Sequence, residues 1–297
     1  MKLWQKNTPT DEKIVHFTVG KDRVYDLHLA AYDCQASIAH VQMLGQIEIL
    51  TEKETQALVG VLNEIKTEAE NGKFLIEDSF EDMHSKIEFI LTQKLGDLGK
   101  KIHTARSRND QVLVSIHLYL KEEISEIKSL INDFFKLLIS LAKKNKDKLL
   151  PGYTHFQVAM PSSFGLWFSA YAESLIDDVT LFNAVQKIVD QNPLGSAAGF
   201  GSSFPINRET TTKALDFGDL KYNVIAAQMS RGKAEKLISN AIASLSATLA
   251  KMAYDICLYM GQDHNFISFP EKLTTGSSIM PHKKNPDVFE LIRGKGN

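Results

Sequence analysis

The sequence contains little cysteine, little proline and no excess of charge of either sign. Its two cysteines, Cys34 and Cys257, are too few for a disulfide framework and have no cysteine partner at a zinc-binding spacing, so we expect both to be buried in a reducing compartment. The 34 basic and 36 acidic residues give a formal net charge of -2, which lacks the basic excess typical of nucleic-acid-binding proteins. The composition therefore favours neither a disulfide-rich secreted protein nor a DNA- or RNA-binding protein.

The sequence also lacks an apolar segment typical of a secretory signal or a membrane span. Residues 1–13 are polar and of mixed charge. The longest stretch without Asp, Glu, Lys or Arg, residues 149–172, is long enough to cross a bilayer, but its prolines and polar side chains favour a loop that leads into a buried helix. We therefore expect a cytoplasmic protein with no membrane segment.

With only 8 prolines among 297 residues, the chain has room for long uninterrupted helices. Apolar residues recur at intervals of three and four over residues 113–141, 168–182 and 238–259. The first segment predicts a helix from near Gln111 to near Lys146, roughly 50 Å long at about 1.5 Å per residue. The pattern predicts an all-α fold with a bundle of long helices, whose apolar faces are typical of helices that also pair between subunits.

Before this bundle the apolar pattern is shorter in range. Thr51 and Glu54 form a capping box for a helix that Asn71-Gly72 would end. We therefore predict a small N-terminal helical domain over residues 1–104 and a central long-helix bundle over residues 105–297. Within the second, residues 191–207 are uncharged and rich in Gly, Ser, Ala and Pro, and a loop of this length usually has a function.

Two polar clusters lie in the breaks between the predicted helices. The segment 103–110 leads into the longest helix, which Ser107, Asn109 or Asp110 could cap, and its arginines suit either carboxylate ligands or solvent. The segment 151–157 contains one histidine, His155, which titrates near neutrality and could transfer a proton, although a lone histidine is more often structural. Neither cluster identifies a reaction by itself.

A third cluster, residues 274–286, combines hydroxyl, amine and amide side chains with glycine and two prolines. Its backbone can present several N–H groups to an anion, and Lys283 and Asn285 add donors where negative charge develops. The glycine spacing does not match a phosphate-binding loop, and the sequence has neither a His-Glu-x-x-His zinc motif nor a calcium-binding loop. We therefore expect an enzyme site with no metal and no organic cofactor.

Together the three clusters resemble the fumarase/aspartase superfamily. Its signature Gly-Ser-Ser-x-Met-Pro-x-Lys-x-Asn-Pro is matched by residues 276–286, and the runs 103–111 and 152–157 resemble those of argininosuccinate lyases in particular. The resemblance extends from about residue 17 to the last residue. It implies a carbon–nitrogen lyase that reversibly splits argininosuccinate into arginine and fumarate, the last step of arginine biosynthesis, through an aci-carboxylate intermediate.

The same resemblance implies roles for individual residues. Ser277 matches the catalytic serine of the family and His155 its catalytic histidine. Side-chain acidity alone would make His155 the base, whereas the superfamily favours a serine alkoxide, with His155 and its partner Glu290 on the acid side. Lys283 and Asn285 would stabilise the intermediate. The substrate would be held by Ser107, Arg108, Asn109, Thr154 and a further histidine of the family, His84, with Asp22 near the position of a substrate-binding serine.

Members of this family are homotetramers whose active sites combine residues of different subunits, so we expect a homotetramer in which an isolated subunit is inactive. Full-length relatives continue past residue 297 through a further small domain, so we expect this chain to be a truncated member. Two alternatives are a catalytically silent helical scaffold that retains the fold, and a sister lyase that acts on another succinyl adduct. The run 106–110 argues against the sister lyase.

Overall fold

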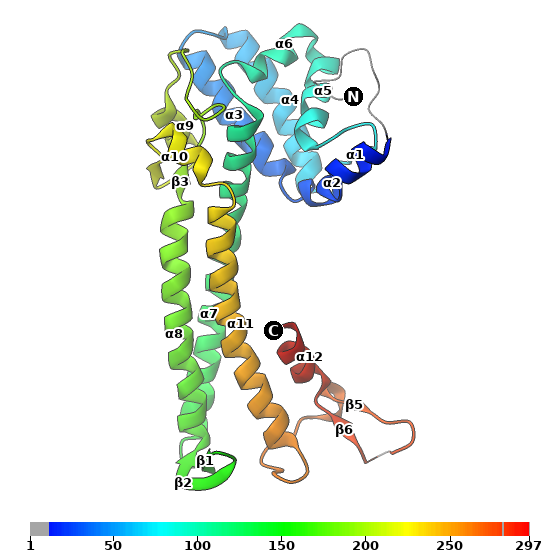
Figure 1. The fold of residues 1–297 in the computed structure, drawn as a ribbon, viewed down its shortest axis with the longest axis vertical. Helices are drawn as coiled ribbons and strands as arrows, with labels where there is room; N and C mark the ends of the chain where they lie inside the picture. Colours follow the sequence, from blue (N-terminus) through cyan, green and yellow to red (C-terminus); the bar gives the residue numbers. More distant parts are fainter. Residues whose placement is uncertain (1–11, 281, 297) are drawn as a thin grey trace. The chain divides into compact units, whose positions relative to one another are not determined.

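The computed structural model describes residues 12–280 and 282–296, which belong to two compact units (Figure 1). The first unit contains the residues up to Glu123 together with Lys187–Ala234, and the second contains Ile124–Gln186 and the residues from Glu235 onward. Three long helices, α7 (Arg108–Lys144), α8 (Phe164–Val189) and α11 (Lys233–Met260), contribute residues to both units. The division into domains at residue 104 stays a prediction.

The first unit is built around two packed helices, α3 (Ala30–Gln46) and α4 (Glu52–Glu70). The hydroxyl of Thr51 accepts a hydrogen bond from the backbone N–H of Glu54 at 3.3 Å, and the Glu54 carboxylate accepts the Thr51 N–H at 2.9 Å. This confirms the predicted capping box, which satisfies N–H groups that the first helical turn leaves unpaired. The helix ends directly before Asn71-Gly72, as predicted.

Shorter elements complete the first unit and enclose its core. They are α1 (Glu12–Val19), α2 (Asp22–Asp26), α5 (Met83–Leu95), α6 (Asp97–Lys100), the 3-10 helix η1 (Lys101–His103), α9 (Arg208–Ala214) and α10 (Val224–Met229), with β3 (Gln191–Asn192) parallel to β4 (Asp219–Leu220). The main core contains fully buried leucines from α3, α4 and α5, including Leu44, Leu58 and Leu91. Their burial removes apolar surface from water and stabilises this helical packing.

In the second unit, parts of α7, α8 and α11 run side by side (Figure 1). Trp167 and Tyr171 of α8 both donate hydrogen bonds to the Asp255 carboxylate of α11, at 2.9 and 2.6 Å. Lys128 of α7 donates to Gln186 of α8 at 2.7 Å. The three long helices predicted from apolar periodicity are therefore present.

Two short hairpins belong to the second unit. β1 (Leu149–Thr154) pairs antiparallel with β2 (Gln157–Ser163), and β5 (Thr275–Gly276) pairs antiparallel with β6 (Lys284–Asn285). The 3-10 helix η2 (Glu271–Leu273) precedes the second hairpin, and α12 (Asp287–Lys295) follows it.

The prediction of a loop before α8 is wrong, because residues 149–163 form the hairpin β1–β2. Backbone pairing satisfies the N–H and C=O groups of this segment, and the sequence alone did not show that its two halves would face one another. The all-α prediction is nevertheless confirmed. The strands of the described residues form only three two-stranded sheets.

The helix α11 is long and apolar, yet few residues of its most apolar window are fully buried in this chain. Among the described residues it alone is long and apolar enough to cross a bilayer, with a mean hydropathy of 1.3 over an 18-residue window that is 22% buried. Length and composition do not distinguish such a span from a core helix of a soluble protein. Cys257 of α11 is only half-buried, whereas Cys34 is fully buried as predicted.

Candidate active site

The predicted site residues lie in both units, and each unit brings together only some of them. The first unit contains Asp22, His84 and the segment 107–109, whereas the second contains Thr154, His155 and the loop and helix from 276 to 290. In the second unit the hairpins β1–β2 and β5–β6 lie at separate places (Figure 1). Within the described part of the chain, no hydrogen bond or ion pair joins His155 to Ser277 or Glu290.

The start of α7 presents Ser107, Arg108 and Asn109. The Ser107 hydroxyl accepts the Asn109 N–H at 3.3 Å, and the Asp110 carboxylate accepts the Ser107 N–H at 2.9 Å, so both residues cap the helix as predicted. The guanidinium of Arg108 lies 3.2 Å from the carboxylate of Asp82, which itself caps α5 through the Ser85 N–H. Helix capping and one ion pair thus hold Arg108 between the N-terminal ends of α5 and α7.

His84 lies in the first turn of α5, and its ring lies beside the carboxylate of Asp33. Its Nδ1 lies 3.0 Å from a carboxylate oxygen of Asp33, and both side chains are buried. Asp33 also accepts hydrogen bonds from Gln111 at 3.1 Å and from Ser115 at 3.3 Å. Burial raises the pKa of Asp33, while nearby Arg106 opposes the rise. Asp33 therefore joins α3 to α7, and the His84 ring of α5 lies beside its carboxylate.

Asp22 opens α2 on the surface of the first unit, and the same helix ends at Asp26. A carboxylate oxygen of Asp26 accepts the backbone N–H of Met83 at 3.0 Å, beside His84. Burial is the main cause that raises the pKa of Asp26 to about 6, while the Met83 hydrogen bond opposes the rise and the charge of Asp22 adds to it. The protonation state of Asp26 therefore changes within an experimentally accessible pH range.

Replacing Asp26 with asparagine should raise the stability of the chain above pH 6. Because the folded-state pKa lies above the ordinary value of 3.8, the folded protein binds this proton more tightly than the unfolded chain. The free energy of unfolding therefore falls as the pH rises from about 4 to about 6, and the uncharged asparagine side chain removes this loss while its carbonyl still accepts the Met83 N–H. Thermal unfolding at pH 4.5 and pH 8 measures the effect, with the exposed Asp147→Asn as the control. Equal midpoints for Asp26→Asn and the parent at pH 8 would contradict it.

His155 occupies the tip of the hairpin β1–β2 in a strained conformation. His155 and Phe156 have φ values of 50° and 58°, between β1 and β2, as in a type I′ turn. Asn and Gly are the usual residues in such a turn, because a left-handed conformation costs other residues about 1–2 kcal/mol each. Thr154 and His155 are exposed, and Phe156 is 73% exposed. The turn therefore presents the predicted catalytic histidine to the outside of the second unit.

The loop between β5 and β6 carries the signature residues, although Pro281 lies outside the described residues. The half-buried Ser277 accepts hydrogen bonds at its Oγ from the backbone N–H groups of Ile279 at 3.3 Å and Met280 at 3.2 Å. Two donors directed at one oxygen favour negative charge on it. Lys283 is exposed, and Asn285 donates to the Thr275 hydroxyl at 3.4 Å.

Glu290 lies exposed in the first turn of α12, where a carboxylate is favoured by the helix dipole. The hairpin β5–β6 is attached to this helix by a hydrogen bond from the Thr275 hydroxyl to Asp287. Lys284 is paired with Glu271 of η2 at 3.0 Å. Lys283, the residue before it, is exposed.

The sequence indicated a helix cap at Asp110, but neither the burial of Asp33 and Asp110 nor the ion pair of Asp82. Asp33 and Asp110 are both completely buried, and Asp82 pairs with Arg108. For Asp33 a signal was present, because it is the only acid among residues 29–44, most of which are apolar, and a buried acid needs a partner. For Asp110 the local pattern indicated only the helix cap, because its further partners lie 85 and 87 residues away along the chain.

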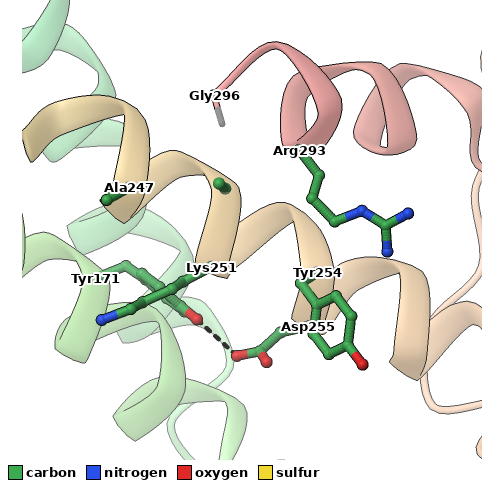
Figure 2. Close-up of a pocket in the computed structure, with 8 residues that line it drawn as sticks. Tyr171, Ala247, Lys251, Tyr254, Asp255, Arg293 and Gly296 are labelled. Atoms are coloured by element: carbon green, nitrogen blue, oxygen red, sulfur yellow. Dashed lines mark hydrogen bonds between the residues drawn. The ribbon is translucent and has the colours of Figure 1, made fainter. Parts of the chain in front are cut away.

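A cavity of about 530 Å³ in the second unit lies apart from all of these residues. Figure 2 shows the Tyr171 hydroxyl bonded to Asp255 in its wall, and the Arg293 guanidinium lies 5.6 Å from the Tyr254 ring. The lining residues are Tyr171, Ala247, Ala250, Lys251, Tyr254, Asp255, Arg293 and Gly296. Since no predicted site residue lines this cavity, its size alone does not mark it as an active site.

Among the described residues, no group of three or more His, Cys, Asp or Glu is placed to hold a metal ion.

Comparison with known proteins identifies extensive sequence similarity. The family described as Lyase matches residues 6–297. Over 296 residues the chain is 55% identical to the argininosuccinate lyase of Parabacteroides distasonis, and it covers 66% of that protein. It is 42% identical over 292 residues to the argininosuccinate lyase of Thermotoga neapolitana and covers 73% of it. The chain thus spans about two thirds of the length of such curated relatives.

Solved structures show the same fold. An EDDS lyase in complex with formate matches 97% of the chain with a TM-score of 0.84 at 24% identity, and the match covers 57% of that structure. Recombinant class II fumarase from Schistosoma mansoni matches 95% of the chain with a TM-score of 0.79 at 17% identity, covering 69% of that structure. At these identities the similarity concerns the fold, and it confirms the fumarase/aspartase-like helical architecture.

Proposed function

The chain belongs to the argininosuccinate lyase family, and from this premise we propose that its protein reversibly cleaves argininosuccinate to arginine and fumarate. The observation that carries the proposal is the geometry of Ser277 in the signature loop. Its oxygen is half-buried and accepts two backbone N–H groups, an arrangement suited to a hydroxyl that must become an alkoxide.

In the proposed reaction Ser277 acts as an alkoxide, takes a proton from the carbon beside a substrate carboxylate and becomes a neutral hydroxyl. The product of this step is an aci-carboxylate, which concentrates negative charge on two oxygens. Each donor placed at such a charge can lower the barrier by about 3 kcal/mol. The exposed ammonium of Lys283 and the amide of Asn285, on the same loop, are the side chains proposed for this role.

Departure of the guanidino nitrogen requires a proton, which we assign to His155 with Glu290 as its partner. The hairpin tip presents His155 outward, and Glu290 is exposed at the start of α12. Because no hydrogen bond or ion pair joins these two residues among the described residues, the proposal has them meet through association of subunits. Thr154, Ser107, Arg108, Asn109, His84 and Asp22 would hold the substrate.

We propose that this association is a homotetramer with active sites shared between subunits. Two surfaces support it: the apolar helix α11, on which Ile242 and Tyr254 are each 43% exposed, and the hairpin β1–β2, on which Phe156, Val158 and Met160 are each about 70% exposed. Large exposed apolar surfaces are typical of protein interfaces.

The same family membership supports a cytoplasmic enzyme of arginine biosynthesis that needs neither metal nor organic cofactor.

The proposal is tested by the ultraviolet absorbance of fumarate released from argininosuccinate. The enzyme would be this chain extended to the length of its relatives, with the 297-residue chain measured beside it. We expect turnover by the extended form and, from size-exclusion chromatography, the mass of four copies. No fumarate from a folded extended form would contradict the reaction, and full turnover by a monomer would contradict the shared site.

A further inference from the structure

The uncharged segment 193–201 of the first unit is held in a strained conformation. Ala197 has a φ of 51°, and the glycines on either side, Gly195 and Gly199, also have positive φ. A left-handed backbone brings the alanine Cβ too close to the following carbonyl oxygen. Such strain persists where the surroundings determine the conformation, and it is common at functional sites. The contacts of this segment therefore show what it is held against.

Side chains from two helices fix Ala197 on both sides. Its backbone N–H and that of Gly195 each donate to the same carboxylate oxygen of Asp110, at 3.0 Å. Its C=O accepts a hydrogen bond from the Gln228 amide of α10 at 3.0 Å. Both polar groups of the strained residue are thereby paired with side chains rather than with neighbouring backbone.

The other oxygen of Asp110 is bound to the start of α7. It accepts the backbone N–H of Ser107 at 2.9 Å, and the carboxylate is completely buried. Ser107 and the two residues after it, Arg108 and Asn109, are those assigned above to the substrate. One buried carboxylate therefore connects the strained segment to the turn that carries three proposed substrate contacts.

We propose that Asp110 is a positioning residue that fixes Ser107, Arg108 and Asn109 by tying the first turn of α7 to the segment 195–197. The inference rests on the proposed function for the identity of the substrate. It goes beyond it in assigning a purpose to the uncharged segment and to an acid that does not itself reach the substrate.

Asparagine cannot replace Asp110 in this arrangement, because all three partners are backbone N–H groups. A backbone donor cannot reverse its direction, so the NH₂ group of an asparagine would face at least one N–H. The buried Asp178 of α8 provides a matched control. Its carboxylate accepts the hydroxyls of Ser244 and Thr248, both at 2.7 Å, and hydroxyls can turn to accept from an amide.

The proposal predicts two effects of Asp110→Asn that Asp178→Asn should not show. In the 297-residue chain, amide hydrogen exchange of a peptide covering residues 193–201 should become at least tenfold faster, as read by mass spectrometry. In the extended form, the KM for argininosuccinate should rise about tenfold, with a smaller change in kcat. A loss of binding that is common to the ground state and the transition state raises KM in this way.

A second variant, Gly195→Ala, tests the same contact by changing the segment instead of Asp110. A Cβ at Gly195, whose φ is 85°, would lie 2.7 Å from Cγ of Arg208, so Gly195→Ala should displace the segment and raise KM in the same direction. Unchanged exchange in Asp110→Asn would overturn the connection, and faster exchange with unchanged KM in both variants would make Asp110 purely structural. If the unsubstituted extended form releases no fumarate, the proposed function fails, while the exchange measurement still decides whether Asp110 holds the segment.

Discussion

Replacing Ser277 with alanine in the extended enzyme is expected to reduce fumarate release by about a thousandfold, the range that a general base typically contributes. The substitution removes the oxygen that accepts the N–H groups of Ile279 and Met280. Those bonds are local to the loop, so the helices should be unaffected. The measurement is kcat by fumarate absorbance, together with circular dichroism at 222 nm.

Ser278→Ala is the matched control, since it removes the neighbouring hydroxyl from the exposed side of the same loop. Its loss of turnover should be far smaller. Comparable losses in the two variants would mean that the loop backbone, rather than the Ser277 oxygen, determines the rate. Survival of turnover in Ser277→Ala would make His155 the leading base, and its replacement by glutamine would then be decisive.

Replacing Leu44 with alanine should lower the free energy of unfolding by about 3–4 kcal/mol. Leu44 is fully buried in α3, in the core that also contains Leu58 and Leu62 of α4. The truncation removes transfer free energy and leaves a cavity that the packed helices only partly fill. A loss of this size is a large share of the net stability of a typical domain.

Urea unfolding of the 297-residue chain measures this loss, with Leu75→Ala as the control. Leu75 belongs to the same unit but is 65% exposed, so the same chemical change should shift the midpoint little. Equal midpoint shifts in the two variants would show that the core of α3 and α4 does not limit the stability of the chain. An altered urea dependence in Leu44→Ala would indicate a change in the unfolded or folded state instead.

Apolar periodicity and capping residues were sufficient to predict the helices. The stripe over residues 113–141 predicted α7, and Thr51 with Glu54 predicted the start of α4. Both signals act between residues three or four apart, so they are complete within the sequence. The hairpin at His155 was missed because its turn contains neither Asn nor Gly, the residues by which such turns are usually recognised.

The signature residues of the proposed site could be predicted from the sequence for a different reason. Ser277, Lys283 and Asn285 lie within one short loop, so their association needs no knowledge of the rest of the fold. The loop conformation that directs two N–H groups at Ser277 came only from the structure. The role proposed for His155 rests on subunit association, since among the described residues no hydrogen bond or ion pair joins it to Glu290.

The sequence by itself determined the long helices, their caps, the composition of the signature loop and the family. Only the tertiary structure decided that Asp33 lies beside His84 and that Asp110 joins α7 to residues 195–197. A buried acid is stabilised by donors that the fold brings from distant parts of the chain. Local spacing identifies an element, but long-range burial selects the partners of its polar side chains, and these partners hold the proposed site in place.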